Sequence, residues 1–312
     1  MFHKNIPNNN KDIIRFLAKN FAGTKKMRNT ILFCSVVIGI VAITMVFGIS
    51  CGKIQAEEIR LIRENGTVSS GRIEDGTEEQ YAKLKQLDYI KRVGKSIFVG
   101  EATDISDDNA KTICDVVWAD SESWNNFLKP AYTNIIGSYP QKKDEILLSK
   151  RALKKLGISE PEQGMEINLD VYKGLFEHSK EKFKLCGWYT DSGNKLAIGY
   201  ISHDKINELN LEKGPYTLLF SQSNHLSRSK TEEKLYQALP MKSADQKIYV
   251  SDTAQYTAVS KFAGGYEMVI LGTLGILCGI YFLVRNVLWI SMSEDIQTVS
   301  YTHLTLPTKR IV

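Results

Sequence analysis

The residues of this sequence that could bind a phosphate or a metal do not stand at the spacing that such sites need. Val93-Gly94-Lys95-Ser96 ends like a phosphate-binding loop, but Tyr89 occupies the position of the earlier glycine that this loop requires. We therefore interpret Lys95 as an exposed strand residue. The acidic cluster at 104–108 could begin a calcium loop, but the glycine and the closing glutamate are missing, so we expect a solvated loop.

Histidine and serine chemistry is also not indicated. None of the five histidines has metal-ligand spacing with Cys, Asp or Glu, and no Gly-x-Ser-x-Gly elbow is present. These histidines are His3, His178, His203, His225 and His303. The sequence therefore predicts a protein that is not an enzyme, with no catalytic, cofactor-binding or metal-binding residues.

The element that organises the chain is the uncharged segment 29–52, NTILFCSVVIGIVAITMVFGISCG. As a helix it is about 36 Å long, enough to cross a hydrocarbon core of about 30 Å. A helix is favoured because lipid offers no hydrogen-bond partners to the backbone. A secretory signal peptide and a buried core helix are the alternatives, but the segment is long for a signal and no A-x-A-like site follows it.

Charge is distributed in a way that predicts orientation. Residues 1–28 carry seven basic side chains against Asp12 alone, whereas residues 53–261 carry 30 basic and 31 acidic ones. The excess lies on the cytoplasmic side by the positive-inside rule, so it indicates topology and no nucleic-acid partner. We expect residues 12–26 to form a basic amphipathic helix on the inner surface of the bilayer. The basic residues assigned to the membrane surface and topology are Lys19, Lys25, Lys26, Arg28 and Arg285.

A second apolar segment, 268–284, continues to residue 290 and predicts a second transmembrane helix at 262–290. Arg285 can extend toward the inner surface, and Trp289 suits the interface. Gly275 and Gly279 form a small-xxx-small face that permits close helix packing, and Gly48 and Gly52 repeat that spacing in the first segment. These four glycines are the candidate helix-packing residues. We expect Gly279→Leu to disturb packing while the outer domain stays folded.

Residues 53–261 alternate helix and strand signals, which predicts an extracytoplasmic α/β or α+β domain. Thr77 and Gln80 form a capping box, and Ser149 can cap a helix that Gly157 ends. The predicted helices are 53–63, 77–87, 121–128, 150–156, 204–209 and 231–239. The predicted strands are 93–99, 112–119, 145–148, 165–172, 183–189, 196–201, 216–220 and 247–250, with 165–172 and 183–189 alternating like a hairpin.

Two cysteines, Cys114 and Cys186, lie in this central region. They could form a disulfide outside the cell, or they could remain two half-buried thiols in strands, and the sequence leaves both open.

Five segments together carry a resemblance to a known family: 25–31 (KKMRNTI), 145–158 (EILLSKRALKKLGI), 164–167 (GMEI), 183–189 (FKLCGWY) and 290–296 (ISMSEDI). The pattern of a basic leader, a span, an outer domain and a second span is similar to FtsX-like/MacB-like permease subunits of ABC transporters. The resemblance covers about residues 10–298. It implies a bacterial membrane protein with two transmembrane helices that flank an extracytoplasmic α/β (α+β) domain resembling the MacB-type periplasmic core domain.

The resemblance also implies how such a subunit works. A separate cytoplasmic ATPase would drive the permease helices and move the outer domain, for export of peptides, lipids or antimicrobials or for mechanotransmission. A second permease copy or a homologue would be the membrane partner. The family has four or more spans, so an N-terminal fragment is implied. The substrate, the total number of spans and the choice between homodimer and heterodimer are not given by the sequence.

The end of the chain departs from the family. Where the family continues with a Gly-Leu-Leu-like segment, this chain has Tyr301-Thr302-His303. Residues 299–312 resemble a translated sequencing-adapter tail, so we exclude them and interpret 291–298 as the cytoplasmic start of a further segment.

A different class of protein shares the predicted topology. A histidine kinase or chemoreceptor also places an extracellular ligand-binding domain between two spans. Such a sensor would continue into a coiled coil or kinase segment after Ile296, and residues 291–297 show no sustained heptad.

Overall fold

The computed structural model describes residues 14–16, 19, 26–104, 111–173, 177–192, 197–223, 227–243 and 245–304. It divides the chain into two compact units, residues 1–53 with 262–312 and residues 54–261. The predicted leader helix at 12–26 and Lys25 lie for the most part outside the described residues, as does the acidic loop at 105–110.

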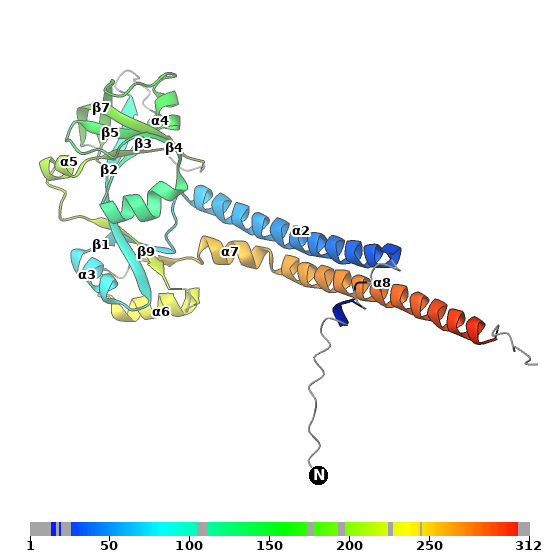
Figure 1. Ribbon diagram of the computed structural model, residues 1–312. Coiled ribbons are helices and arrows are strands. Elements are labelled where there is room, and N and C mark those ends of the chain that lie inside the picture. The colour runs from blue at the N-terminus through cyan, green and yellow to red at the C-terminus, as the bar shows by residue number, and fades with distance from the viewer. Residues whose placement is uncertain are drawn as a thin grey trace, which may run out of the picture. The chain divides into compact units, whose positions relative to one another are not determined.

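Two long helices dominate the first unit. Helix α2 (Lys26–Asn65) begins there and continues past Lys53, and helix α8 (Ala263–Leu304) follows the second unit in the sequence (Figure 1). By length and composition, Lys26–Asn65 and Val269–Ser293 are each able to cross a membrane. Helix α2 extends beyond the predicted span 29–52 at both ends. The apolar part of α8, Val269–Ser293, ends after the predicted span 262–290.

Helices α2 and α8 contact each other in an antiparallel register. Arg28 Nη1 donates to Ser291 Oγ, and a Cβ placed on Gly39 would lie 2.0 Å from Ile280 Cδ1. Between these contacts α2 advances eleven residues while α8 goes back eleven. A further eleven residues along, Ser50 and Val269 are again buried. Eleven residues are about three helical turns, so the same faces meet throughout.

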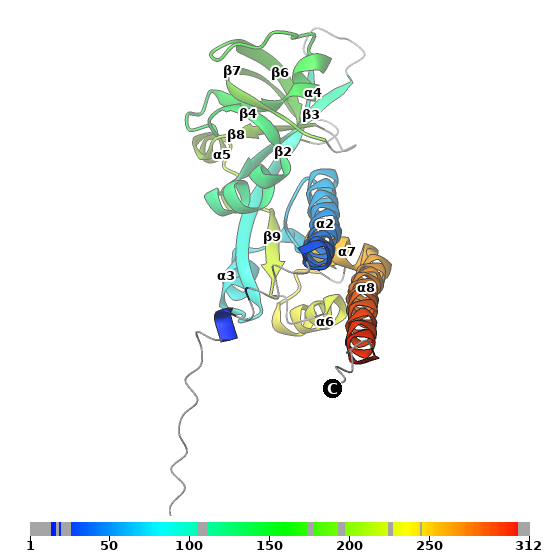
Figure 2. The same ribbon diagram turned by 45° about the vertical axis from the view of Figure 1, so that its right-hand side comes forward.

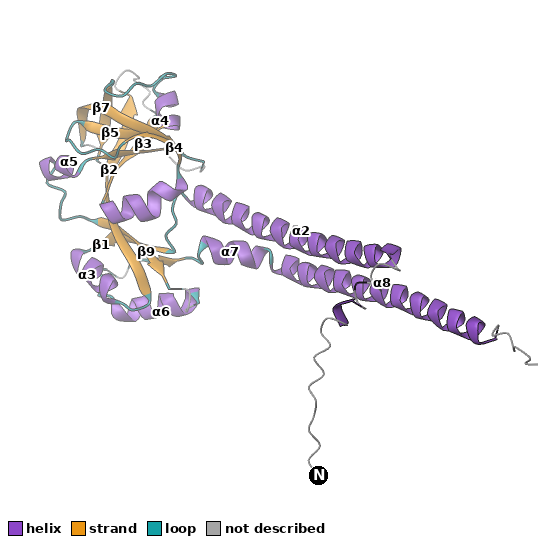
Figure 3. Cartoon of the chain, viewed as in Figure 1, coloured by secondary structure: helices purple, strands orange, loops and turns teal. Residues whose placement is uncertain are grey.

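The second unit contains ten described strands in one sheet (Figure 3). The strands are β1 (Gly71–Gly76), β2 (Ile90–Asp104), β3 (Thr112–Ala119), β4 (Thr133–Gly137), β5 (Glu145–Ser149), β6 (Glu166–Tyr172), β7 (His178–Thr190), β8 (Ala197–Ile201), β9 (Tyr216–Gln222) and β10 (Ile248–Val250). The helices are α3 (Glu78–Gln86), the π-helix η1 (Ser123–Leu128), the 3-10 helix η2 (Lys129–Ala131), α4 (Lys150–Lys155), α5 (His203–Glu208), α6 (Arg228–Ala238) and α7 (Ala254–Lys261).

Strand β2 belongs to two parts of this sheet. Its first half pairs with β9 in an open antiparallel sheet of order β10-β1-β9-β2. Its second half pairs with β3 on one side and β6 on the other. The pairings β3 with β8, β8 with β5, β5 with β7 and β7 with β6 then close a six-stranded barrel.

Gly100 lies where β2 passes from the open sheet to the barrel. The β2–β3 register shifts between Phe98 and Gly100, and a Cβ on Gly100 would lie 2.2 Å from the carbonyl oxygen of Tyr172 in β6. A residue without a side chain is therefore needed for β6 to approach, as is common at a bulge.

Alternation along the strands builds two hydrophobic clusters. The larger cluster fills the barrel and the space under α3 and α6, which contribute Leu84 and Leu235. Helices α3 and α6 are seen against the open sheet in Figures 1 and 2. The smaller cluster lies on the outer side of β5, β7 and β8, where Leu147, Tyr189 and Tyr200 meet Trp124 of η1. Strand β5 is buried on both faces for this reason.

Several local predictions are confirmed. Thr77 and Gln80 form the capping box of α3, Ser149 Oγ accepts from Ala152 N, and Gly157 has φ +75°. Strand 112–119 is β3, and β6 and β7 form the antiparallel pair that the alternation at 165–172 and 183–189 indicated.

Other predictions are wrong. Lys95 is a half-buried rather than an exposed strand residue. Only 22% of its side chain is exposed, and its Nζ forms an ion pair of 2.8 Å with Glu78. The predicted helix 121–128 does not end at Leu128, because the helical segment continues as η2 and accommodates the ring of Pro130 in its first turn. The sequence patterns also missed β1, β4 and α7.

Candidate functional site

The sheet of the second unit is entered and left by the chain at one place. Ser251 N donates to Ser70 O at 2.8 Å, and the adjoining strands pair Gly71 with Val250. Ser70 Oγ accepts from Gln222 N at 2.7 Å, which fixes the same point to β9. The strand that follows α2 and the strand that precedes α7 are therefore hydrogen-bonded side by side.

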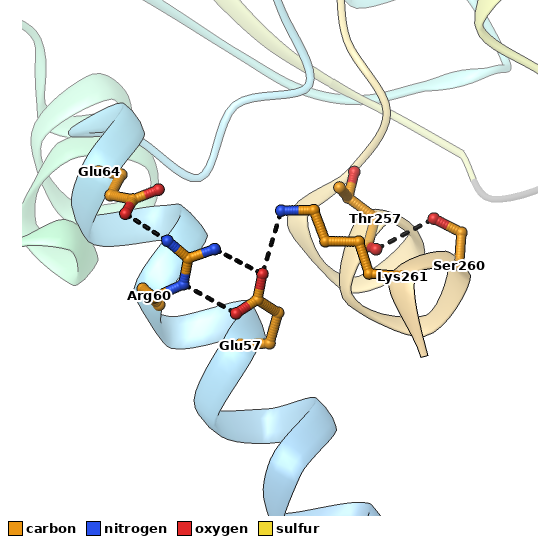
Figure 4. A network of polar contacts seen from close by, with 6 residues as sticks. All are labelled: Glu57, Arg60, Glu64, Thr257, Ser260 and Lys261. Carbon is orange, nitrogen blue, oxygen red and sulfur yellow. Dashed lines mark hydrogen bonds and ion pairs between the residues drawn. The ribbon is translucent and has the colours of Figure 1, made fainter. Parts of the chain in front are cut away.

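A charged network joins the two helices next to this point, and we call it the junction: Glu57, Arg60 and Glu64 of α2 with Lys261 of α7 (Figure 4). Arg60 donates to both carboxylate oxygens of Glu57 at 2.8 and 2.7 Å and to Glu64 at 2.5 Å. Lys261 Nζ donates to Glu57 Oε1 at 3.1 Å. Glu57 is thus shared by a cation of its own helix and a cation of α7.

The electrostatics of the junction follow from this sharing. Hydrogen bonds from Arg60, and then from Lys261, lower the pKa of Glu57 from 4.5 to about 2. The Glu57 carboxylate in turn raises the pKa of Arg60. Arg60 is exposed and Glu57 is half-buried, so water still screens their attraction, and the network fixes the positions of the two helices more than it adds stability.

The charged residues of α2 at the junction have a spacing in the sequence that could have predicted an ion-pair network on one helix face. Glu57, Arg60 and Glu64 follow the i, i+3 and i+7 spacing of one helix face. Thr253 precedes α7 as a capping residue: its Oγ1 accepts from Tyr256 N at 3.2 Å and its carbonyl accepts from Thr257 N.

A cleft of about 620 Å³ opens on the face of the open sheet opposite α3 and α6. Its floor follows the strand register: Phe98 is paired with Val117, Ser96 with Thr217, and Arg72 with Leu219. These side chains alternate with core residues along each strand, so they share the uncovered face. The cleft also reaches the end of α2 and the start of α6.

The charged groups of the cleft are partly paired. Arg151 Nε donates to Asp191 Oδ1 at 2.9 Å and its Nη2 to Oδ2, and Arg72 contacts Glu74 at 3.1 Å. The other two arginines that line it are Arg63 and Arg228.

A buried tyrosine cluster supports the barrel side of the cleft. The hydroxyls of Tyr132 and Tyr200 are 2.6 Å apart, and Tyr189 donates to Ile198 O at 2.8 Å. Burial raises the pKa of Tyr132 to about 12 and those of Tyr189 and Tyr200 well above 10. These hydroxyls remain neutral hydrogen-bonding groups and act as structural supports.

The four candidate packing glycines face open space within the described part of the chain. Among described atoms, nothing lies within 4 Å of a Cβ built on Gly48, Gly52, Gly275 or Gly279. Their role in packing against other helices stays a prediction. Gly39, which the spacing argument missed, lies against Ile280 of α8.

The basic residues assigned to topology lie at separate places. Lys19, Lys26 and Arg285 are exposed, Arg28 is half-buried against Ser291, and Lys25 lies outside the described residues. Their orientation toward the cytoplasm stays a prediction.

The central cysteines are free thiols. Cys114 is fully buried in β3 and Cys186 is half-buried in β7, and burial raises the pKa of each thiol to about 12. Within the described ranges, no three His, Cys, Asp or Glu side chains gather as metal ligands would.

Two solved structures are similar to part of this chain. One is a domain of a protein named as a permease from Porphyromonas gingivalis, with 10% identity, 59% of this chain and 86% of that chain covered, and a TM-score of 0.34. The other is the extracellular domain of the noncanonic ABC-type transporter YknZ from Gram-positive bacteria, with 12% identity, 57% and 89% covered, and a TM-score of 0.36. No family model and no curated protein matches the sequence.

Proposed function

We propose that the chain is a permease subunit of an ABC transporter that couples ATP hydrolysis on a separate cytoplasmic ATPase to movement of its outer domain. The subunit itself carries out no reaction. It lies in the cell membrane with its N-terminus in the cytoplasm and residues 53–261 outside, beside a second permease copy or a homologue.

One observation supports this proposal above the others. Helix α2 continues for 40 residues from the apolar segment to Asn65, and beside its end Ser70 is hydrogen-bonded to Ser251. A continuous helix transmits displacement and rotation along its axis. A domain whose two connections are tied at one point receives that motion as a unit.

The experiment uses the complete permease with the ATPase encoded beside it, reconstituted in lipid nanodiscs. After the exposed thiols at positions 34, 51 and 278 are changed to serine, spin labels are placed at Glu79 on α3 and Gln297 on α8. We expect ATP and vanadate to shift the distance between these labels. A matched pair across the junction, at Gln55 on α2 and Ser260 on α7, should keep its distance, because the two connections are held together there.

An unchanged distance between the labels at Glu79 and Gln297, with the ATPase turning over, contradicts the coupling. The genomic sequence past Thr298 tests the class of protein separately. Two or more further spans and a neighbouring gene with a nucleotide-binding loop are expected. A coiled coil or kinase segment after Ile296 would instead establish the sensor.

A further inference from the structure

The cleft on the open sheet exposes an unusual side chain. Phe98 is 54% exposed although it lies in the long strand β2, with β9 and β3 on either side. Its cross-strand partner is Val117, and Leu219 of β9 lines the same cleft. Apolar surface of this kind, gathered in a hollow of about 620 Å³, is typical of a ligand pocket, which commonly spans roughly 300–1,000 Å³.

The charges that line the cleft are not equally engaged. Three of its four carboxylates are held by arginines: Glu64 by Arg60, Glu74 by Arg72 and Asp191 by Arg151. The fourth is Asp115. In the part of the chain that the structure describes, Arg63 and Arg228 line the cleft without an ion pair or hydrogen bond.

A guanidinium presents a fork of N–H donors that matches the oxygens of a carboxylate or phosphate. Two uncommitted guanidinium groups against one carboxylate therefore favour an anionic head. The apolar floor favours a hydrocarbon body on the same molecule. The hydroxyl of Thr217 lines the same cleft as a further possible donor, whereas the hydroxyls of Ser96 and Ser251 donate to the carbonyl oxygens of Thr217 and Ser70.

We propose that this cleft binds an anionic amphiphile, whose carboxylate or phosphate head contacts Arg63 and Arg228 and whose hydrocarbon chain lies on Phe98, Val117 and Leu219. The inference does not rest on the proposed function, because binding requires neither the ATPase nor transport.

The test uses the full chain in nanodiscs with a photoreactive probe, an octyl phosphate that carries a diazirine on its chain. Mass spectrometry locates the labelled peptides. We expect label on the peptides that contain Phe98, Val117 or Leu219. Excess octyl phosphate and decanoate should compete, since each joins an anionic head to a chain, and they separate phosphate from carboxylate preference.

Two further competitors test the two halves of the ligand. Octyl glucoside has the chain without the charge, and inorganic phosphate has the charge without the chain. Neither should reduce labelling more than about two-fold. Competition by octyl glucoside as strong as by octyl phosphate would overturn the anionic requirement, and competition by inorganic phosphate alone would overturn the amphiphile.

Variants then assign the residues. Arg63→Gln with Arg228→Gln, and separately Phe98→Ser, should each lower labelling of the cleft at least ten-fold, whereas Phe98→Leu should retain it. The controls are Arg92→Gln, an exposed arginine outside the cleft, and Ile136→Ser, an exposed apolar residue on β4. Equal labelling in the cleft variants and the controls contradicts the site.

A thermal unfolding measurement first checks that each variant is folded and has the same unfolding temperature as the wild type. If the double arginine variant does not fold, Arg228→Gln alone is used, because this residue is exposed at the start of α6. A folded Arg228→Gln protein that labels like wild type likewise contradicts the proposal.

Discussion

Lys261 Nζ lies 3.1 Å from a carboxylate oxygen of Glu57, which precedes it by 204 residues in the sequence. Glu57 lies on α2, which precedes the ten-stranded sheet in the sequence, and Lys261 lies on α7, which follows the sheet. The contact therefore closes the domain at its base, where Ser70 and Ser251 are already hydrogen-bonded.

The pKa of Glu57 should report this contact. Arg60→Gln should raise it further toward 4.5 than Lys261→Gln, because the bidentate hydrogen bond from Arg60 is the larger cause of the lowering to about 2. Since the folded pKa is depressed, any stabilisation by the pair is present above pH 4.5 and is lost as the pH falls toward 2. Carbon NMR titration of the labelled carboxyl measures it, with Glu57→Gln as the assignment control. A larger shift in Lys261→Gln would reverse the ranking.

Gly39 should tolerate a side chain poorly. A methyl group there meets Ile280 Cδ1, so Gly39→Ala should destabilise the α2–α8 pair by about 1–3 kcal/mol, the usual cost of overpacking. Adding Ile280→Ala should recover part of that loss, which unfolding in mixed detergent micelles measures as a double-mutant cycle. Additive losses would show that the two residues do not share a contact.

Gly279→Leu gives the matched comparison. The space around this position is open among the described atoms, so the variant should leave the α2–α8 pair intact. We still predict a loss of transport. The small-xxx-small face of Gly275 and Gly279 is not used by α2, so we expect it to pack against other helices, and a leucine would block that packing. Wild-type transport and ATP coupling in Gly279→Leu would argue against a packing role.

The tyrosine pair under the cleft should contribute measurably to stability. Tyr132→Phe leaves the buried Tyr200 hydroxyl without this partner, which costs about 1–3 kcal/mol. Changing both residues to Phe should cost less than the two single losses together. Denaturant unfolding measures the effect, and Tyr249→Phe, exposed on β10, should stay within about 0.5 kcal/mol of wild type.

The central thiols should be unreactive in the folded protein. Burial raises the pKa of Cys114 and Cys186 to about 12, so little thiolate forms at pH 8. Iodoacetamide should modify neither residue until the domain is unfolded, when both react. Because the folded pKa values exceed 9, the unfolded state loses these protons first, and stability should fall as the pH rises from 9 to 12. Mass spectrometry that finds a Cys114–Cys186 disulfide would contradict this account.

Local signals in the sequence predicted much of the fold. Thr77 and Gln80 specify their helix through the atoms of the cap itself, and strand 112–119 has a run of β-branched and aromatic side chains. Strand β1 was missed because GRIEDG is short, polar and bounded by glycines. It is a strand because β9 and β10 pair with it from both sides.

The candidate site was harder to predict for a physical reason. The junction joins residues 204 positions apart, and the cleft joins β1, β2, β3 and β9, so only the closed topology brings them together. Lys95 shows the same limit, because its exposure depends on Glu78, Tyr81 and Tyr216, which lie on other elements.

The pairing of β1 with β10 determines how the sheet would respond to a force applied at its two connections. Gly71 opens β1 and Val250 closes β10, and these two residues are partners, so both connections attach to the same end of the strand pair. Drawing the connections apart would peel the pair open one hydrogen bond at a time, starting at Ser70 and Ser251. Displacing them together leaves those bonds unstressed and passes the force to β9. The sheet is therefore easily opened when its two connections are pulled apart, and it stays intact when they move together.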